Sequence, residues 1–287
     1  MTARLLGSCR FPPSGTHLTC GVSGGADSLA LLVLATAAGC RVTAVHVDHG
    51  LRPGSSAESE VVAAAAGRFG ACFRAERAHV APGPNLEARA RAVRLAVLGE
   101  GAATGHTADD QAETMILNLM RGAGLDGLAG MRPGPRHPIL ALRRRDTVAL
   151  CASEHLQPVT DPTNFDPVHR RNRVRHEVMP LLCEVAGRDL VPVLTRQGAL
   201  LADEADLLDN MVIGADPTDA RWLAGAPLPL ARRSVRRWLR DEEGHPPAAA
   251  AVERVLAVAG GQFRACEVGD GLRVARTEGR LRTEPIT

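Results

Sequence analysis

The chain has 287 residues, 45% of them hydrophobic and 23% charged, as in a globular protein with room for one large domain or two ordinary ones. No apolar run reaches the ~18 residues of a membrane helix, and the N-terminal stretch lacks a signal-peptide core, so we expect a cytoplasmic protein with no membrane partner. All 34 basic residues are arginine, which excludes a Walker A phosphate loop because that motif needs its lysine.

The cysteines and the charge pattern further restrict the kinds of site and partner that the protein can have. The seven cysteines are scattered without a CxxC pair, which indicates reduced thiols rather than a disulfide framework or a zinc or iron–sulfur site. The formal net charge is only +2, yet arginines gather at 136–145, 169–175 and 232–240. One such cluster is most simply a solvated helix face, but three in one chain favour a polyanionic partner.

In chain order, the first half alternates strand-like apolar runs with helical patterns. Strands are expected at 17–22, 41–47 and 102–105, and helices at 27–38, 55–69, 86–98 and 107–122. This alternation predicts an α/β fold with a doubly wound, mainly parallel sheet. Ligands of such sheets bind beyond the carboxyl ends of the strands.

The second half is predicted to be helical and then mixed. Beyond about residue 175 the pattern becomes helical, and 214–230 is rich in Pro and Gly, as at a boundary. Two helical stretches then flank "GHPP", and the last residues resemble short strands with turns at 269–271 and at Gly279. We therefore expect a catalytic domain over 1–182, a helical linker over 183–213 and a small α+β C-terminal domain over 214–287.

The stretch "CGVSGGADSLALL", residues 20–32, places two glycines between a predicted strand and a predicted helix. Glycines allow close backbone approach, and the N–H groups of the loop and of the helix start favour an anion. Ser23 and Ser28 add hydroxyl donors, and Asp27 would hold Mg²⁺ bridging to a phosphate. The alternative is a tight turn in which Asp27 or Ser28 only caps the helix.

This stretch resembles the SGGxDS signature of the ATP pyrophosphatase (PP-loop) superfamily at every fixed position. Members of that superfamily split ATP into AMP and pyrophosphate while they adenylate a carbonyl oxygen. The resemblance implies that the loop holds the pyrophosphate end of ATP, and that the cofactor-binding residues are Ser23, Gly24, Gly25, Ala26, Asp27 and Ser28.

Two further stretches carry candidate site residues. In "HVDHGLR", residues 46–52, a metal site is conceivable, but Ala44 leaves the HxHxDH hydrolase pattern incomplete. In "GHTADDQAETMILNLMRG", residues 105–122, Thr107 is the predicted helix cap and Asp110 falls at its third position. Asp110 and Glu113 share a helix face and exceed what a cap requires, so this carboxylate pair suits an ammonium group.

Together with "ARAVR" (90–94), "DPTN" (161–164) and "RRNRVRHEVMPLL" (170–182), these stretches resemble the tRNA(Ile)-lysidine synthetase family. The motifs stand in the family's order over roughly residues 17–182. The family joins free L-lysine to C2 of the wobble cytidine in the CAU anticodon of an isoleucine tRNA, using ATP and Mg²⁺ and an adenylated cytidine. The family's usual "RPLL" is "HPIL" here (137–140), which weakens any role for a first arginine at that place.

The resemblance implies a role for each matching position. His106 would lie by the nucleotide, and Arg91 would contact it and help to organise the reaction, although Arg91 also fits a plain surface arginine. Asp110 and Glu113 would bind the lysine substrate, and one of them would accept a proton from its amine. The tRNA would be bound by Arg171, Asn172, Arg173 and Arg175, whose alternative is a solvated basic face.

Other functions remain open at this point. A tRNA thiolase of the same superfamily relies on cysteine pairs or an iron–sulfur cluster, which the scattered cysteines disfavour. An amidotransferase such as GMP synthetase needs a glutaminase domain for which no room remains. A non-catalytic nucleotide-binding module leaves the acidic cluster without a purpose. The low aromatic content, 2%, disfavours base stacking as the main mode of tRNA binding. The sequence does not fix the oligomeric state, and a homodimer is among the states it allows.

Overall fold

The computed structural model describes residues 1–48, 55–78, 86–240 and 246–286. The chain divides into two compact units, Met1–Ala202 and Asp203–Thr287. The division falls within one long helix, α10 (Val191–Met211), in the part of the sequence where a helical linker is predicted.

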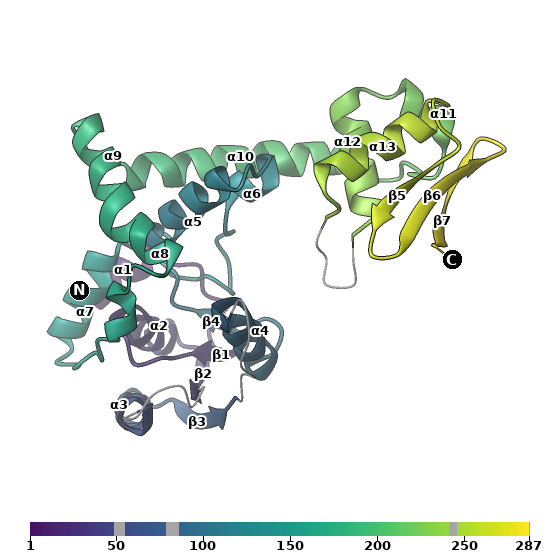
Figure 1. The fold of residues 1–287 in the computed structure, drawn as a ribbon. Helices are drawn as coiled ribbons and strands as arrows, with labels where there is room; N and C mark the ends of the chain where they lie inside the picture. The colour runs from purple at the N-terminus through teal and green to yellow at the C-terminus, as the bar shows by residue number, and fades with distance from the viewer. Residues whose placement is uncertain (49–54, 79–85, 241–245, 287) are drawn as a thin grey trace. The chain divides into compact units, whose positions relative to one another are not determined.

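The first unit is built on a parallel sheet, as the alternation of strands and helices predicts (Figure 1). Its strands are β1 (His17–Gly21), β2 (Arg41–Asp48), β3 (Cys72–Arg77) and β4 (Ala103–Thr104), in the order β3-β2-β1-β4. In the register of the sheet, Cys20 of β1 lies opposite Ala44 of β2 and Ala103 of β4. The sequence did not predict β3, because this edge strand is largely exposed and lacks apolar alternation.

Helices cover both faces of this sheet. Leu18, Cys20 and Val42 pack into the main core with α2 (Ala26–Ala37) and α3 (Ser55–Arg68). On the other face, Val45 packs against Leu98 of α4 (Leu86–Leu98). After β3 the chain crosses to the other face of the sheet and forms α4 there. It then returns to the sheet as β4, which pairs with β1 on the side of β1 that is away from β2. The crevice at the carboxyl ends of β1 and β4 is therefore the topological switch point, where such sheets bind ligands.

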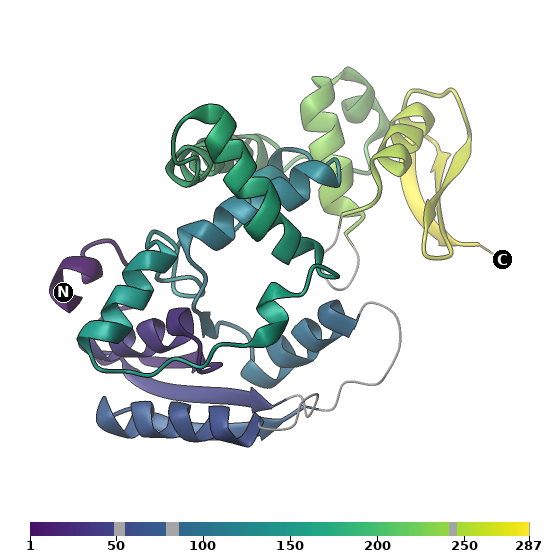
Figure 2. The same cartoon turned by 60° about the vertical axis from the view of Figure 1, so that its left-hand side comes forward.

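The first unit contains further helices and helical turns. They are α1 (Thr2–Leu6), α5 (Ala108–Met120), α6 (Leu125–Ala129), α7 (Arg144–Ser153), the 3₁₀ turn η1 (Pro162–Phe165), α8 (Arg170–Arg173), the π-helical turn η2 (Val174–Val178) and α9 (Met179–Ala186). Helix α7 packs on α2, and α5 packs against α8 and η2 (Figure 2). Ala112 and Ile116 of α5 share one core with Val174 and Met179. This packing brings the acidic helix and the arginine-rich segment together.

The second unit contains α11 (Ala220–Gly225), α12 (Leu228–Trp238), α13 (Ala249–Ala259) and an antiparallel sheet of β5 (Ala265–Gly269), β6 (Leu272–Thr277) and β7 (Arg280–Pro285). Val235, Val255 and Val274 form part of its core. The predicted turns are confirmed, because Gly271 and Gly279 take φ of +70° and +78° between the strands. Within the described ranges, the helices are too short or too polar to cross a membrane.

Candidate active site

The glycine loop lies where the sequence predicts it, between the end of β1 and the start of α2. Gly24 takes φ of +87°, which favours glycine, and its carbonyl accepts a hydrogen bond of 3.0 Å from the Val159 N–H. The Ser28 hydroxyl accepts from the Ser23 N–H at 3.1 Å and donates to the Gly25 carbonyl at 2.9 Å. The Ser28 N–H donates to the Gly25 carbonyl at 3.1 Å, so the N–H groups that precede it at the start of α2, together with the helix dipole, suit this loop to an anion.

The end of β4 closes against the same loop. A Cβ atom at Gly105 would lie 2.7 Å from the Asp27 carbonyl oxygen, so this close approach requires glycine. His106 follows directly, and its Nδ1 lies 2.7 Å from the Thr104 Oγ1, which is also 3.0 Å from Nδ1 of His137. The hydroxyl has one proton and lies 3.2 Å from the Arg136 carbonyl. The Nδ1 atoms of His106 and His137 also lie 3.3 Å apart, so the two imidazoles and the Thr104 hydroxyl form one polar cluster beside the loop.

The acidic pair lies at the start of α5. Thr107 caps the helix in a capping box, and Oδ2 of Asp110 accepts both the Thr107 N–H and its hydroxyl at 2.9 Å. The side chain of Asp110 is 10% exposed and that of Glu113 is 2% exposed. Asp110 therefore has two functions in the structure. Its Oδ2 atom caps the helix, and its Oδ1 atom faces the arginines that also contact Glu113.

Three arginines surround this pair. Arg144 reaches Asp110 at 3.2 Å and Glu113 at 3.1 Å. Arg171 reaches the same two carboxylates at 3.1 and 3.2 Å. Arg175 lies 2.7 Å from Glu113 and 3.3 Å from Asp110. Burial acts to raise the pKa of Asp110, but the guanidinium groups of Arg144 and Arg171 outweigh it and lower that pKa to about 2. Asp110 is thus ionised at every physiological pH.

Arg144 also connects the acidic pair to Asp27 in the glycine loop. Its Nε lies 3.7 Å from Oδ2 of Asp27, whose other oxygen accepts a hydrogen bond from the Thr147 hydroxyl. Burial raises the pKa of Asp27 above its ordinary value, and the bond from Thr147 only partly opposes this. The side chain of Asp27 keeps 27% of its surface exposed, so a ligand in the loop can reach it. Asp27, Asp110 and the guanidinium between them form one charged site.

Within the basic stretch 136–145, Arg143 and Arg144 form ion pairs inside the site, whereas Arg136 and Arg145 are exposed, and contact of this stretch with a polyanion stays a prediction. The Arg143 guanidinium contacts both oxygens of Asp109 at 3.0 and 3.1 Å, and the Arg144 N–H donates to Asp109 at 2.8 Å. Burial acts to raise the pKa of Asp109, but these bonds lower it overall. Sequence reasoning missed Arg144, Thr147 and His137 as site residues, because their partners are more than thirty residues away along the chain.

The predicted tRNA-binding residues have different environments. Arg171 and Arg175 point at the acidic pair, whereas Arg173 is exposed and pairs with Glu177 at 2.8 Å. Asn172 is buried and donates to the carbonyls of Thr163 and Asp166 at 2.7 and 2.9 Å. Their contact with tRNA stays a prediction.

Three residues of the stretches "ARAVR" (90–94) and "HVDHGLR" (46–52) have side chains outside the part of the chain that the structure describes. Arg91 falls within α4, but its side chain is outside the described part of the chain, as are His49 and Arg52. His46 is 2% exposed, and its Nδ1 lies 3.0 Å from the Val22 carbonyl, a contact that fixes the ring under the loop.

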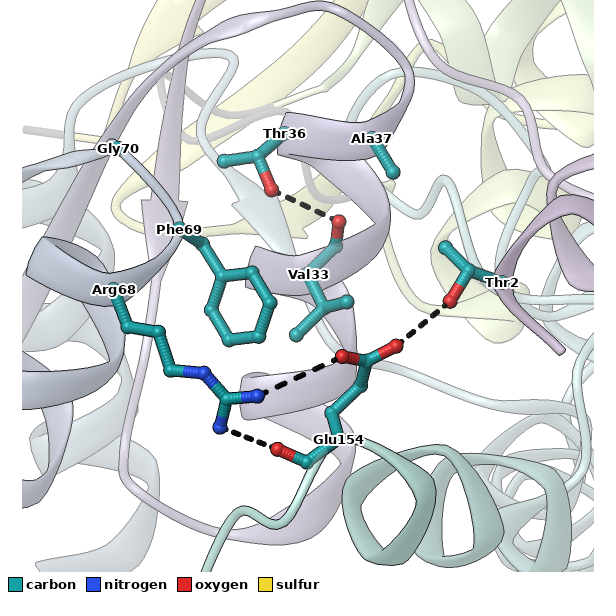
Figure 3. Close-up of a pocket in the computed structure, with 8 residues that line it drawn as sticks. All are labelled: Thr2, Val33, Thr36, Ala37, Arg68, Phe69, Gly70 and Glu154. Carbon is teal, nitrogen blue, oxygen red and sulfur yellow. Dashed lines mark hydrogen bonds and ion pairs between the residues drawn. The ribbon is translucent and has the colours of Figure 1, made fainter.

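A hollow of about 470 Å³ lies away from the glycine loop, near the amino-terminal ends of β2 and β3 (Figure 3). It is lined by the carboxyl ends of α2 and α3, which lead into the starts of β2 and β3. Arg68 and Glu154 form an ion pair across it, and Thr2 donates to Glu154 at 3.1 Å (Figure 3). These polar groups satisfy one another, which is typical of a structural contact between α1, α3 and α7.

Comparison with known proteins agrees with this geometry. A sequence profile of the PP-loop domain matches residues 4–182. The chain is 41% identical to the tRNA(Ile)-lysidine synthase of Nocardia farcinica, over 83% of this chain and 80% of the relative. It is 38% identical to the tRNA(Ile)-lysidine synthase of Thermobifida fusca, over 86% of this chain and 83% of the relative. The solved U34-tRNA thiolase NcsA from Methanococcus maripaludis shares the fold at a TM-score of 0.55 and 15% identity, over 70% of this chain and 78% of that one. The chain therefore belongs to the tRNA(Ile)-lysidine synthase family of PP-loop proteins.

Proposed function

We propose that this chain ligates free L-lysine to C2 of the wobble cytidine of the CAU-anticodon isoleucine tRNA, with ATP converted to AMP and pyrophosphate. The observation that carries the proposal is the meeting of the phosphate loop with a buried acidic pair. Arg144 lies within 3.7 Å of Asp27, Asp110 and Glu113 at once. A loop suited to ATP and a pocket suited to an ammonium ion are thus one side chain apart.

The loop residues fit the pyrophosphate end of ATP, since Gly24 and Gly25 leave the backbone open and the start of α2 faces the ligand. Asp27 is a hard oxygen donor beside that loop and fits Mg²⁺ bound through the phosphates. Among the described residues no cluster of three or more His, Cys, Asp or Glu could hold a metal ion by itself. In this proposal Asp27 would hold the ion together with the phosphates of ATP, and the ion would neutralise charge on the departing pyrophosphate.

The reaction needs the O2 oxygen of cytidine to become a leaving group. That oxygen attacks the α-phosphorus of ATP, an O–P bond forms, and pyrophosphate leaves with the electrons of the broken P–O bond. The ε-ammonium group of lysine then gives up a proton, which a carboxylate of the acidic pair would accept. The neutral nitrogen attacks C2, and AMP leaves with the electrons of the C2–O2 bond. The chain's contribution is to position the three substrates and to stabilise the charge that develops. In this proposal the glycine loop and the charged site position ATP and lysine, and the arginine-rich surfaces position the tRNA.

Asp110 is the member of the acidic pair whose role in this scheme follows from its electrostatics. Asp110 has a pKa of about 2, so it is a weak base and suits a permanent anchor for an ammonium group of lysine. Three carboxylates, Asp27, Asp110 and Glu113, face three guanidinium groups, so the site is close to neutral before any ligand enters. A lysine cation would add positive charge, and the phosphates of ATP would draw the arginines and release the carboxylates. We therefore expect ATP to favour lysine binding.

The proposal assigns the tRNA to the arginine-rich surfaces. Residues 1–182 would be the catalytic domain, 183–213 the linker, and 214–287 a tRNA-binding domain. In the second unit, Arg236 and Arg237 of α12 add to the basic surface beside Arg232, which pairs with Glu253. A cytoplasmic location, where tRNA, ATP and free lysine meet, is part of this proposal.

The direct test is incorporation of labelled lysine into an unmodified isoleucine tRNA transcript with a CAU anticodon, in the presence of ATP and Mg²⁺. A parallel reaction uses the same transcript with the wobble cytidine changed to uridine. Label that appears only with cytidine supports both the reaction and the target base. Pyrophosphate release that depends on tRNA, without label, would keep the ATP chemistry and reject lysine as the nucleophile.

Two isosteric variants test the acidic pair within the same assay. Asp110→Asn and Glu113→Gln are expected to keep ATP-dependent adenylation and to lose lysine transfer, since only the second step needs the ammonium site. Full transfer by both variants would reject the assignment of this pair to lysine.

A further inference from the structure

One aromatic side chain stands out on the surface next to the charged site. Phe165 ends η1 and is 63% exposed, the most exposed of the chain's five phenylalanines. Its ring stacks on the ring of His176, with centroids 5.3 Å apart and an interplanar angle of 24°. One face of the phenyl ring is thus supported by imidazole, and the side chain remains largely open to solvent. The exposed side chain is therefore available for stacking with a flat ligand.

The ring is held in place by a rigid local structure. The Asp161 side chain caps η1 by accepting the Thr163 N–H at 2.9 Å. Buried Asn172 donates to the carbonyls of Thr163 and Asp166, which flank the ring in sequence. Nε2 of His176 lies 3.0 Å from the Asn164 carbonyl, so this nitrogen is the donor and the imidazole is oriented. The platform is therefore organised before any ligand arrives, which lowers the entropic cost of binding.

The same segment links the platform to the reaction site. Before η1, the Val159 N–H bonds to the Gly24 carbonyl in the phosphate loop. After η1, Arg171 and Arg175 reach Glu113, and Arg175 directly precedes His176. The stacked pair thus belongs to a short stretch of chain that is anchored at both ends to the proposed binding sites of ATP and lysine.

The chemistry around the ring favours a nucleobase. Every base presents a flat π-face, and stacking on an aromatic side chain is the sequence-tolerant way to bind an unpaired base. Arg170 is exposed on α8, less than two turns before His176, where it suits a phosphate beside such a base, whereas Arg173 on the same helix already pairs with Glu177. The nearby carboxylates of Asp161 and Asp166 accept N–H groups of their own loop, at Thr163 and Val168, which reduces their repulsion of phosphate.

We propose that Phe165, supported by His176, is the platform on which an unpaired base of the tRNA anticodon loop stacks when the wobble base enters the site. This inference rests on the proposed function for the identity of the RNA. It also modifies the expectation from the low aromatic content, since a single well-placed ring is enough for one base. The wider affinity for tRNA is still assigned to arginine contacts with phosphates.

The test compares three variants in the full chain. Phe165→Ala removes the platform, Phe165→Trp preserves it, and Val168→Ala is the matched control, because Val168 is 81% exposed on the same loop and outside the stacked pair. In the lysine incorporation assay, Phe165→Ala is expected to raise the KM for tRNA about 5- to 150-fold. Phe165→Trp and Val168→Ala are expected to stay within about threefold of the original chain, and circular dichroism checks that each variant is folded.

A binding measurement separates stacking from activity. Anticodon stem-loops carry 2-aminopurine at one loop position at a time, and its fluorescence falls when the base stacks. We expect quenching at one or two positions on binding to the original chain and to Phe165→Trp, and its loss with Phe165→Ala. Unchanged quenching and an unchanged KM in Phe165→Ala would overturn the proposal. Absence of lysine incorporation by the original chain would instead reject the proposed function, and the fluorescence arm would still decide whether Phe165 stacks on RNA.

Discussion

Replacing Asp110 with asparagine tests whether the buried acidic pair is as strongly held as its contacts indicate. The amide has the shape of the protonated acid, but it cannot carry the charge that three arginines share. Because the folded-state pKa is about 2 and the ordinary value is 3.8, the charged form contributes about 2 kcal/mol to the free energy of unfolding. We expect Asp110→Asn to lose about that amount at pH 7. The loss stays below the 3–5 kcal/mol typical of a broken buried pair, since Glu113 still faces the arginines.

The dependence on pH follows from the sign of the shift. A carboxyl group whose pKa is lowered by folding stabilises the folded chain above its ordinary pKa, and this contribution is lost as the pH falls through the folded-state pKa. The difference between the original chain and Asp110→Asn should therefore be constant from pH 7 to pH 5. It should fall to about half near pH 3.

The assay is urea unfolding followed by far-ultraviolet circular dichroism, with hydrogen exchange of α5 as a local readout. Trp222 and Trp238 both lie in the second unit, so their fluorescence reports on that unit and provides an internal reference. Glu184→Gln, on the exposed face of α9, is the matched control and should change the free energy of unfolding by less than about 0.5 kcal/mol. A loss below about 0.5 kcal/mol for Asp110→Asn at pH 7 would refute the reasoning.

Three further predictions concern ligands and the loop. Calorimetry should show tighter lysine binding when Mg²⁺ and a non-hydrolysable ATP analogue are present, and equal affinity with and without the analogue would contradict the charge argument. Gly105→Ala should raise the KM for ATP and destabilise the chain by about 1–3 kcal/mol, because the added Cβ would lie 2.7 Å from the Asp27 carbonyl oxygen. An unchanged KM and an unchanged free energy of unfolding would show that the backbone can shift there without cost. His137→Asn should raise the KM for ATP with little change in kcat, because it removes the ring that shares the Thr104 hydroxyl with His106; an unchanged KM would exclude this positioning role.

Local patterns were enough to predict most elements of the first unit and the position of the phosphate loop. Strand and helix differ in the period of their apolar residues, and the loop needs a glycine such as Gly24, whose φ of +87° is unfavourable for other residues. The cap at Thr107 and the shared helix face of Asp110 and Glu113 are also local properties, which the structure confirms. The edge strand β3 was missed, because an exposed strand does not show the apolar signal on which the prediction depends.

The sequence by itself determined the candidate groups: a glycine loop suited to an anion, an acidic helix and three arginine-rich stretches. Only the tertiary structure decided which of these groups meet. Arg144 and Arg175 lie 31 and 62 positions from Glu113, yet both contact it, while Arg173 turns to solvent. Ion pairs and stacked rings, such as Phe165 on His176, depend on distances of a few ångströms that arise after the chain has packed. Spacing along the sequence does not contain those distances, because the packing of α5 against α8 and η2 creates them.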